Sequence, residues 1–138
     1  MNSCPLCQAN NETTLWRDER CRVILVADPD YPGFCRVVSN EHVAEMTDLE
    51  EEGQAHLMSV VFAVERTLRM LLKPDKINLA SLGNQIPHLH WHVIPRFADD
   101  AQFPDAVWAA KRRAGNPRPV DNAALSALLG RYLASAIH

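Results

Sequence analysis

Three histidines stand at every second residue of one stretch, at positions 88, 90 and 92, separated by Leu89 and Trp91. In a β-strand this spacing places the three imidazoles on one face and the apolar residues between them on the other. A neutral imidazole can bind a metal ion or attack an electrophile such as phosphorus. The spacing therefore indicates a chemical site on one face of a strand whose other face packs into a core.

Two kinds of site fit His88, His90 and His92. One is a catalytic zinc site with an open position, although side chains along one straight strand project in parallel rather than converge on an ion. The other is a histidine nucleophile whose second ring nitrogen is held by an acceptor while a neighbour protonates the leaving group. The preceding turn, Gly83-Asn84-Gln85, could bind phosphoryl oxygens through backbone N–H groups.

The four cysteines fall into two groups. Cys4 and Cys7 form a Cys-x-x-Cys pair that could hold one side of a tetrahedral metal and that needs two further ligands. Cys21 and Cys35 are isolated, in or beside expected strands, and are interpreted as small buried residues. This pattern favours a reducing compartment, and hence the cytoplasm, over a disulfide framework.

Composition limits the fold and the partners. A chain of 138 residues with 47% hydrophobic residues is long enough for one domain, 1–138, and too short for two. A net charge of −3 argues against a nucleic-acid polymer as the partner. The apolar runs are shorter than a membrane span and the first residues lack a leader pattern, so we expect no membrane association.

Apolar periodicity outlines the elements that must position these groups. Strands are expected over 13–17, 22–27, 34–38, 76–82 and 88–95. A long helix is expected from Thr47, where Thr47 and Glu50 fit a capping box, to Pro74. Residues 97–119 are expected to be irregular, and Asp121 can cap a closing helix.

The residues His88 to Ile94 fit the alternating His-apolar signature of the histidine triad (HIT) superfamily of nucleotide hydrolases and transferases. The turn 83–85, the following Pro95-Arg96 and the segment from Pro32 to His42 resemble the parts that flank the signature. The likeness covers about residues 1–110. The chain is most similar to bacterial members with an N-terminal Cys-x-x-Cys, near the diadenosine polyphosphate hydrolases and nucleoside phosphoramidases.

This resemblance implies an α+β fold with an antiparallel sheet of about five strands, one long helix, and a C-terminal extension over 97–138 with a closing helix. It implies a homodimer joined through the long helix and an edge strand. It implies His90 as the nucleophile and His92 as the contact to the phosphate or leaving group, in a triad with His88. Substrate-binding roles carry over to the following positions: Asp28, Asn78, Gly83, Asn84 and Gln85.

The resemblance also implies four zinc ligands: Cys4, Cys7, His42 and His88. Some bacterial members with the leading cysteines hold zinc in this way. A Cys2His2 set completes a closed tetrahedral site, which would be structural and would fix the N-terminal knuckle, residues 1–11, to the sheet. No cofactor is then required for the chemistry.

The leading hypothesis is a hydrolase that acts on the α-phosphate of dinucleoside polyphosphates or nucleoside phosphoramidates through a nucleotidyl-histidine intermediate. The alternatives are a nucleotidyl transferase or phosphorylase of the same family, and a nucleotide-binding regulatory module with negligible turnover. Phe103 or Trp108 could touch a base. Arg96 and the run 111–113 could attract polyphosphate or form a solvated face.

Overall fold

The computed structural model describes residues 4–136, and its centre is a five-stranded sheet in the order β1-β2-β3-β5-β4. All neighbouring strands are antiparallel. The strands are β1 (Thr13–Arg17), β2 (Cys21–Leu25), β3 (Cys35–Ser39), β4 (Lys76–Ala80) and β5 (His90–Arg96). The expected α+β class with an antiparallel sheet is confirmed. Residues 1–3 of the expected knuckle and 137–138 of the expected extension lie outside the described residues.

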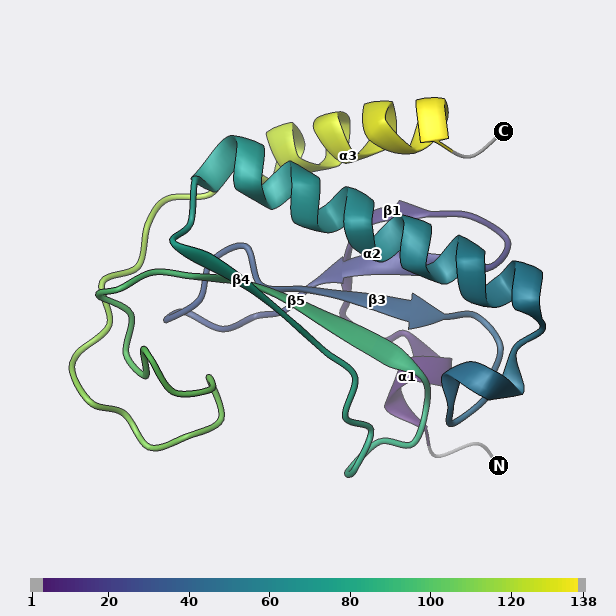
Figure 1. Cartoon of the computed structure of the whole chain (residues 1–138), viewed down its shortest axis with the longest axis horizontal. Coiled ribbons are helices and arrows are strands. Elements are labelled where there is room, and N and C mark those ends of the chain that lie inside the picture. Colours follow the sequence, from purple (N-terminus) through teal and green to yellow (C-terminus); the bar gives the residue numbers. More distant parts are fainter. Residues whose placement is uncertain (1–3, 137–138) are drawn as a thin grey trace.

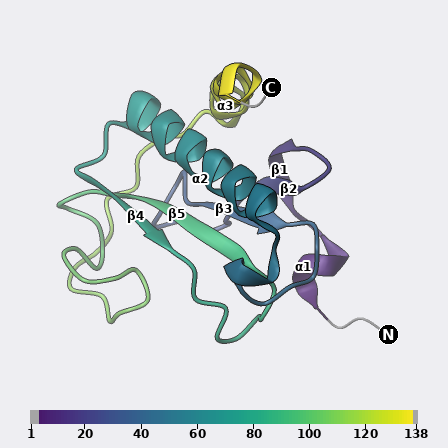
Figure 2. The ribbon, with the colours of Figure 1, turned by 45° about the vertical axis from the view of Figure 1, so that its right-hand side comes forward.

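Two long helices, α2 (Glu51–Leu72) and α3 (Asn122–Ala136), cover one face of the sheet (Figures 1 and 2). The structure also has the short helix α1 (Pro5–Gln8) and a 3-10 turn, η1 (Met46–Asp48). The side chain of Asp121 accepts the N–H of Ala124 at the start of α3, as the sequence predicts. None of the helices within residues 4–136 is both long and apolar enough to cross a membrane.

The expected start of the long helix at Thr47 is wrong by four residues. The carboxylate of Asp48 accepts the backbone N–H of Glu45 at 3.0 Å, which closes the turn η1 instead of capping a continuous helix. Helix α2 therefore begins at Glu51. It ends where Lys73 adopts a left-handed conformation (φ 50°) directly before Pro74.

The core lies between the sheet and the two long helices. Val23, Val37 and Val93 point from the central strands toward α2 and are fully buried there. Leu89 is buried in the same cluster, and Trp91 packs against it. The apolar residues that alternate with the histidines thus lie on the core side, as expected.

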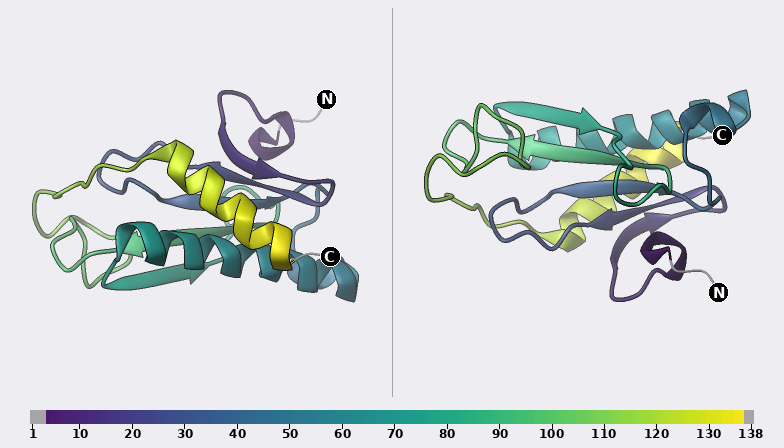
Figure 3. Two further views of the ribbon diagram at one scale, coloured as in Figure 1. Left: turned by 90° about the horizontal axis from the view of Figure 1, so that it is seen from above. Right: turned by 90° about the horizontal axis from the view of Figure 1, so that it is seen from below.

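The opposite face of the sheet is free of α2 and α3, which lie behind it when the molecule is viewed from below (Figure 3, right). Helix α1 packs on part of this face, where Leu6 contacts Ile24 and Val38. His90 and His92 belong to the same face, because they alternate with the core-facing residues of β5. This face is where a site can form.

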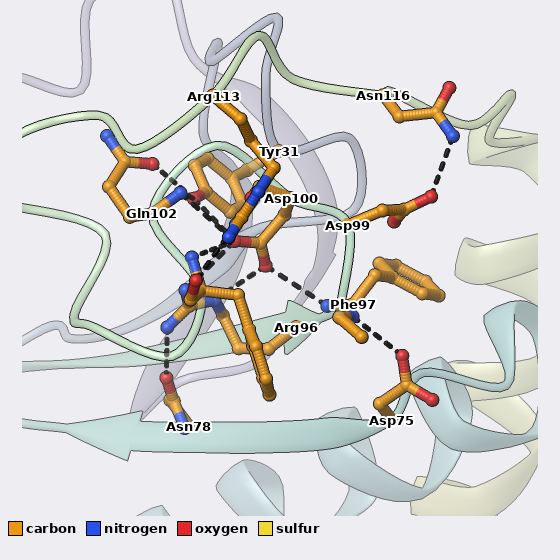
Figure 4. A network of polar contacts seen from close by, with 12 residues as sticks. Tyr31, Asp75, Asn78, Arg96, Phe97, Asp99, Asp100, Gln102, Arg113 and Asn116 are labelled. Carbon is orange, nitrogen blue, oxygen red and sulfur yellow. Dashed lines mark hydrogen bonds and ion pairs between the residues drawn. The ribbon is translucent and has the colours of Figure 1, made fainter.

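The irregular segment 97–121 is fastened to the sheet by the ion pair between Arg96 and Asp100 (Figure 4). The Nε and Nη2 atoms of Arg96 donate to the Asp100 carboxylate at 2.9 and 3.0 Å, and both residues are buried. That carboxylate also accepts the hydroxyl of Tyr31 and the backbone N–H groups of Phe97 and Phe103. Arg96 is therefore a buried residue with a structural role, and its binding of polyphosphate stays a prediction.

Candidate active site and metal centre

The strand that carries the histidines begins at His90, two residues later than the sequence predicts. His88 lies in the preceding segment, and all three histidines are buried. The rings of His90 and His92 are near neighbours, with centroids 4.9 Å apart. His88 points elsewhere, because its ring packs against that of His42 at 4.9 Å. The triad is thus divided into a pair, His90 and His92, and a separate His88.

The orientation of His90 is set by one hydrogen bond. Its Nδ1 lies 2.6 Å from the backbone carbonyl oxygen of His88, which can only accept, so Nδ1 carries the proton. Burial lowers the pKa of His90; the hydrogen bond to the His88 carbonyl acts in the opposite direction, and the charge of Arg36 adds to the decrease, so that the pKa lies below its ordinary value. The ring is therefore neutral near pH 7, and the lone pair is on Nε2.

His92 lies between two aromatic side chains. Its ring centroid is 5.7 Å from that of Phe34 and 5.0 Å from that of Trp108, both in edge-on geometry. Its Nδ1 is buried without a hydrogen-bond partner among the described residues. Burial, followed by the charges of His90 and Arg36, lowers the pKa of His92 to about 4. A buried, unsatisfied and neutral imidazole is typical of a group that meets its partner in a ligand.

His90 and His92 line one cavity of about 270 Å³. Its remaining walls come from the loop between β4 and β5, from β3 and from the irregular segment: Arg36, Leu82, Gly83, Asn84, Gln85, Ile86 and Trp108. The turn residues that the sequence singles out for phosphate binding therefore lie beside the two histidines. Gly83 has a φ of +69°, a conformation that L side chains rarely adopt, so glycine suits this turn.

Two further candidates do not line this cavity. The side-chain oxygen of Asn78 accepts the Nη1 of Arg96 at 2.8 Å, which ties it into the buried network of Figure 4. The carboxylate of Asp28 accepts the backbone N–H of Asp30 at 3.0 Å and closes a turn. Both have a structural role in the protein alone, and their substrate-binding roles stay predictions.

The four residues predicted to bind zinc also lie close together in the structure. The ligand atoms of Cys4, Cys7, His42 and His88 all lie within 4.8 Å of one another. The Nδ1 of His88 is 3.4 Å from each of the two sulfur atoms and 3.1 Å from the Nδ1 of His42. The sulfur of Cys7 is 3.0 Å from the Nδ1 of His42.

These distances fit a tetrahedral zinc ion. Zinc bonds to nitrogen and sulfur of 2.0–2.3 Å place the ligand atoms of a tetrahedron roughly 3.3–3.8 Å apart. The four separations given above, 3.0–3.4 Å, lie within a few tenths of an ångström of this range, and the other two pairs lie within 4.8 Å. The Nε2 of His88 donates to the carbonyl of Ser39 at 2.6 Å, so the lone pair of this ring is on Nδ1, which faces the other three ligands. Of the three triad histidines, it is His88 that lies in this Cys2His2 cluster.

One residue of the cavity, Arg36, is absent from the predictions made from the sequence. It lies in β3 directly opposite His92 of β5. The available signal was a single charged residue between Cys35 and Val37 in an otherwise apolar strand. Such a residue must point to the face opposite the core, but the sequence alone does not show which strand lies beside it.

The fold and this histidine pair are those of the histidine triad class of proteins. Residues 8–99 match the family model of the HIT domain, which is about two thirds of the chain, so the protein belongs to the HIT family. The solved structure of a histidine triad protein from Bradyrhizobium japonicum is 28% identical, with a TM-score of 0.70, and the match covers 100% of this chain and 97% of that one. A histidine triad protein from Marinobacter aquaeolei VT8 is also 28% identical, with a TM-score of 0.72 and 93% of each chain covered.

The names of two further relatives mention an activity and a metal. An AP-4-A phosphorylase from Mycobacterium tuberculosis is 30% identical over 89 residues, which cover 60% of this chain and 46% of that protein. The chain thus spans about half the length of that relative. A zinc-bound histidine triad family protein from Mycobacterium smegmatis shares the fold, with 24% identity, a TM-score of 0.64 and coverage of 96% and 94%.

Proposed function

We propose that the protein is a nucleotide-processing enzyme in which the Nε2 of His90 attacks the α-phosphorus of a dinucleoside polyphosphate or a nucleoside phosphoramidate. The observation that carries this proposal is the hydrogen bond from the Nδ1 of His90 to the carbonyl of His88. It fixes the neutral ring with its lone pair on Nε2, in a residue that lines the cavity. A buried neutral imidazole held in one tautomer is a prepared nucleophile.

The proposed reaction has two steps. In the first, the bond between Nε2 and the α-phosphorus forms, and the bond from phosphorus to the leaving group breaks with its electron pair. A polyphosphate oxygen leaves as an anion, whereas a phosphoramidate nitrogen takes up a proton from solvent and leaves as an amine. In the second, water attacks the same phosphorus, gives up a proton, and returns the electron pair of the P–N bond to His90. His92 contacts the phosphate or leaving group, and backbone N–H groups of 83–85 bind phosphoryl oxygens.

A second candidate activity differs only in the acceptor. The M. tuberculosis relative is named a phosphorylase, and phosphate in place of water would release a nucleoside diphosphate from the same intermediate. Product analysis separates the two. With diadenosine tetraphosphate, water yields AMP and ATP, whereas phosphate yields ADP and ATP. The regulatory alternative predicts binding with no product in either case.

We propose that Cys4, Cys7, His42 and His88 hold a structural zinc ion. The closed four-ligand set supports this, because no position is open for substrate. When bound, the ion would tie the N-terminal segment to the sheet. His88 would then have two functions, since its ring binds the metal and its backbone carbonyl holds His90.

We also propose that two copies of the chain form a homodimer through α2 and the edge of the sheet at β4. Phe62, Met70 and Leu71 of α2 are 52%, 57% and 40% exposed, which leaves an apolar surface on a helix whose other side is buried in the core. Separately, the strand β4 is an edge strand of the sheet. A second copy would cover both features.

The test of the proposed activity is the variant His90→Asn, assayed with diadenosine tetraphosphate and with adenosine phosphoramidate. Loss of the nucleophile should lower turnover by about three orders of magnitude or more, while nucleotide binding is largely kept. His56→Asn, which removes an imidazole on α2 outside the cavity, should retain turnover. Full turnover by His90→Asn would overturn the assignment.

A further inference from the structure

The guanidinium of Arg36 is a partly buried cation without a counter-ion of its own among the described residues. Its Nε is buried and has no hydrogen-bond partner within residues 4–136. Burial lowers the pKa of Arg36, and the carboxylate of Glu12 acts in the opposite direction. Glu12 is occupied, however, because its two oxygens accept the Nε and Nη2 of Arg22, both at 2.8 Å.

The two buried arginines of the described chain, in contrast, are paired. Arg22 is held by Glu12, and Arg96 is held by Asp100. Withdrawing a cation from water is unfavourable unless an anion or several acceptors replace the water. Arg36 thus carries a desolvation cost that its described surroundings offset only in part, which is typical of a group whose partner is a ligand.

The position of Arg36 identifies the kind of ligand. It lines the cavity together with His90, His92 and the turn 83–85. In the register of β3 and β5 it lies opposite His92, whereas Val38 lies opposite His90. Its place along the strands is therefore displaced from the proposed nucleophile toward His92, the residue proposed to contact the leaving group.

We propose that Arg36 binds an anionic phosphate beyond the α-phosphate, and that it thereby selects substrates with a polyphosphate leaving group. This proposal rests on the proposed function of the site. When His90 attacks diadenosine tetraphosphate at its α-phosphorus, the departing oxygen belongs to ATP and gains negative charge. A guanidinium beside His92 stabilises that charge through charge-assisted hydrogen bonds. The amine that leaves a phosphoramidate has no phosphate for Arg36 to bind.

The kinetic test compares Arg36→Gln, Arg36→Lys and the parent protein on both substrates. We expect Arg36→Gln to lower kcat/KM for diadenosine tetraphosphate by about 10- to 100-fold, the loss typical of a charged hydrogen bond, and to change kcat/KM for adenosine phosphoramidate by less than about 3-fold. The kcat/KM of Arg36→Lys for diadenosine tetraphosphate should lie between the values of Arg36→Gln and the parent, because lysine keeps the charge. Arg17→Gln, which removes an exposed arginine of β1, is the matched control and should change neither. Equal losses on both substrates, or no loss on either, would overturn the proposal.

A binding measurement keeps this test separate from that of the nucleophile. Trp108 lies in the cavity wall, so its fluorescence can report binding of ATP and of adenosine even if no substrate is turned over. Arg36→Gln should weaken ATP binding about tenfold and leave adenosine binding unchanged. Unchanged ATP affinity would contradict the role of Arg36 without touching that of His90.

A third readout separates ligand binding from a structural role. Because the Nε of Arg36 has no partner to lose within residues 4–136, the melting temperature of Arg36→Gln without ligand should equal or exceed that of the parent. A large decrease in both Arg36→Gln and Arg36→Lys would show that the guanidinium supports the fold and would overturn the proposal. ATP should raise the melting temperature of the parent more than that of Arg36→Gln.

Discussion

The backbone carbonyl of His88 and the Nδ1 of His90 are 2.6 Å apart, and this hydrogen bond joins the two clusters of the protein. The ring of His88 lies in the Cys2His2 cluster, and the ring of His90 lies in the cavity wall. A change in the position of His88 therefore shifts the acceptor that orients His90. The metal cluster and the proposed nucleophile should be coupled.

Replacing Cys4 and Cys7 by serine should abolish zinc binding, lower the melting temperature and lower kcat. Metal binding stabilises only the folded state, so its loss destabilises the protein, and His88 then orients His90 less well. Zinc content by atomic emission, thermal unfolding and steady-state kinetics measure the three effects.

The matched control for that pair is Cys35→Ala. Cys35 is a buried cysteine outside the metal cluster, so this variant should keep the zinc stoichiometry of the parent. Unchanged zinc content in the Cys4 and Cys7 double variant would contradict the four-ligand site.

His92 should make the protein less stable as the pH falls from about 6.5 to 4. The unfolded chain protonates this group near the ordinary histidine pKa of 6.5, whereas the folded protein holds it neutral until about 4. The unfolded state therefore binds more protons in this window, and the cost reaches about 3 kcal/mol at pH 4. The free energy of unfolding of His92→Gln, measured by urea denaturation across this range, should fall less steeply than that of the parent. Equal slopes would contradict a buried, neutral His92.

The pair of Arg96 and Asp100 should dominate the attachment of segment 97–121. Burial alone would raise the pKa of Asp100, but hydrogen bonds from Arg96 and from the N–H of Phe97 outweigh it and lower this pKa to about 2. Asp100→Asn should reduce the free energy of unfolding at pH 7 by about 3 kcal/mol, because it leaves a buried cation without its partner. The difference should shrink as the pH falls from about 4 through 2, because the unfolded chain takes up the proton near pH 3.8 and the folded parent only near pH 2.

Urea denaturation measures this difference, and Asp105→Asn is its control. Asp105 forms an exposed ion pair with Arg112 on the same segment, so its replacement should leave the denaturation midpoint unchanged. An Asp100→Asn variant as stable as the parent would show that the network of Figure 4 does not hold the segment in place.

Phe62→Glu should convert the proposed dimer into a monomer. A carboxylate in the centre of an apolar contact between two copies would be buried without a partner. Light scattering after gel filtration measures the molar mass. Ala55→Glu, at an exposed position of the same helix, adds the same charge and should leave the dimer intact. A parent protein that is already monomeric would contradict the dimer.

The sequence predicts much of this site because period-two alternation assigns each residue of a strand to one face. His90 and His92 lie opposite the core for this reason, and the glycine at position 83 marks the turn beside them. The resemblance to the HIT superfamily predicts that Cys4, Cys7 and two distant histidines form one cluster. Local spacing carries the first two of these predictions, and the family resemblance carries the third.

Other features depend on contacts that spacing does not encode. Thr47 and Glu50 match a capping box, yet the carboxylate of Asp48 closes an earlier turn with the N–H of Glu45. Which of these two turns forms depends on the backbone conformation before α2, and the sequence pattern does not encode it. Arg96 finds its partner in Asp100, at the start of an irregular segment with no periodicity. The role proposed for Arg36 depends on which charged groups and hydrogen-bond acceptors lie around it, and these neighbours are brought together only by folding.

The most direct test of the central claim is to trap the nucleotidyl intermediate on His90. The parent protein and His90→Asn would be mixed with diadenosine tetraphosphate, quenched within milliseconds at alkaline pH, where a phosphoramidate survives, and analysed by intact mass and peptide mapping. We predict an adduct of one nucleoside monophosphate on the peptide that contains His90 in the parent, and none in His90→Asn. Turnover by the parent without any adduct, or an adduct of equal yield in His90→Asn, would contradict the proposed mechanism.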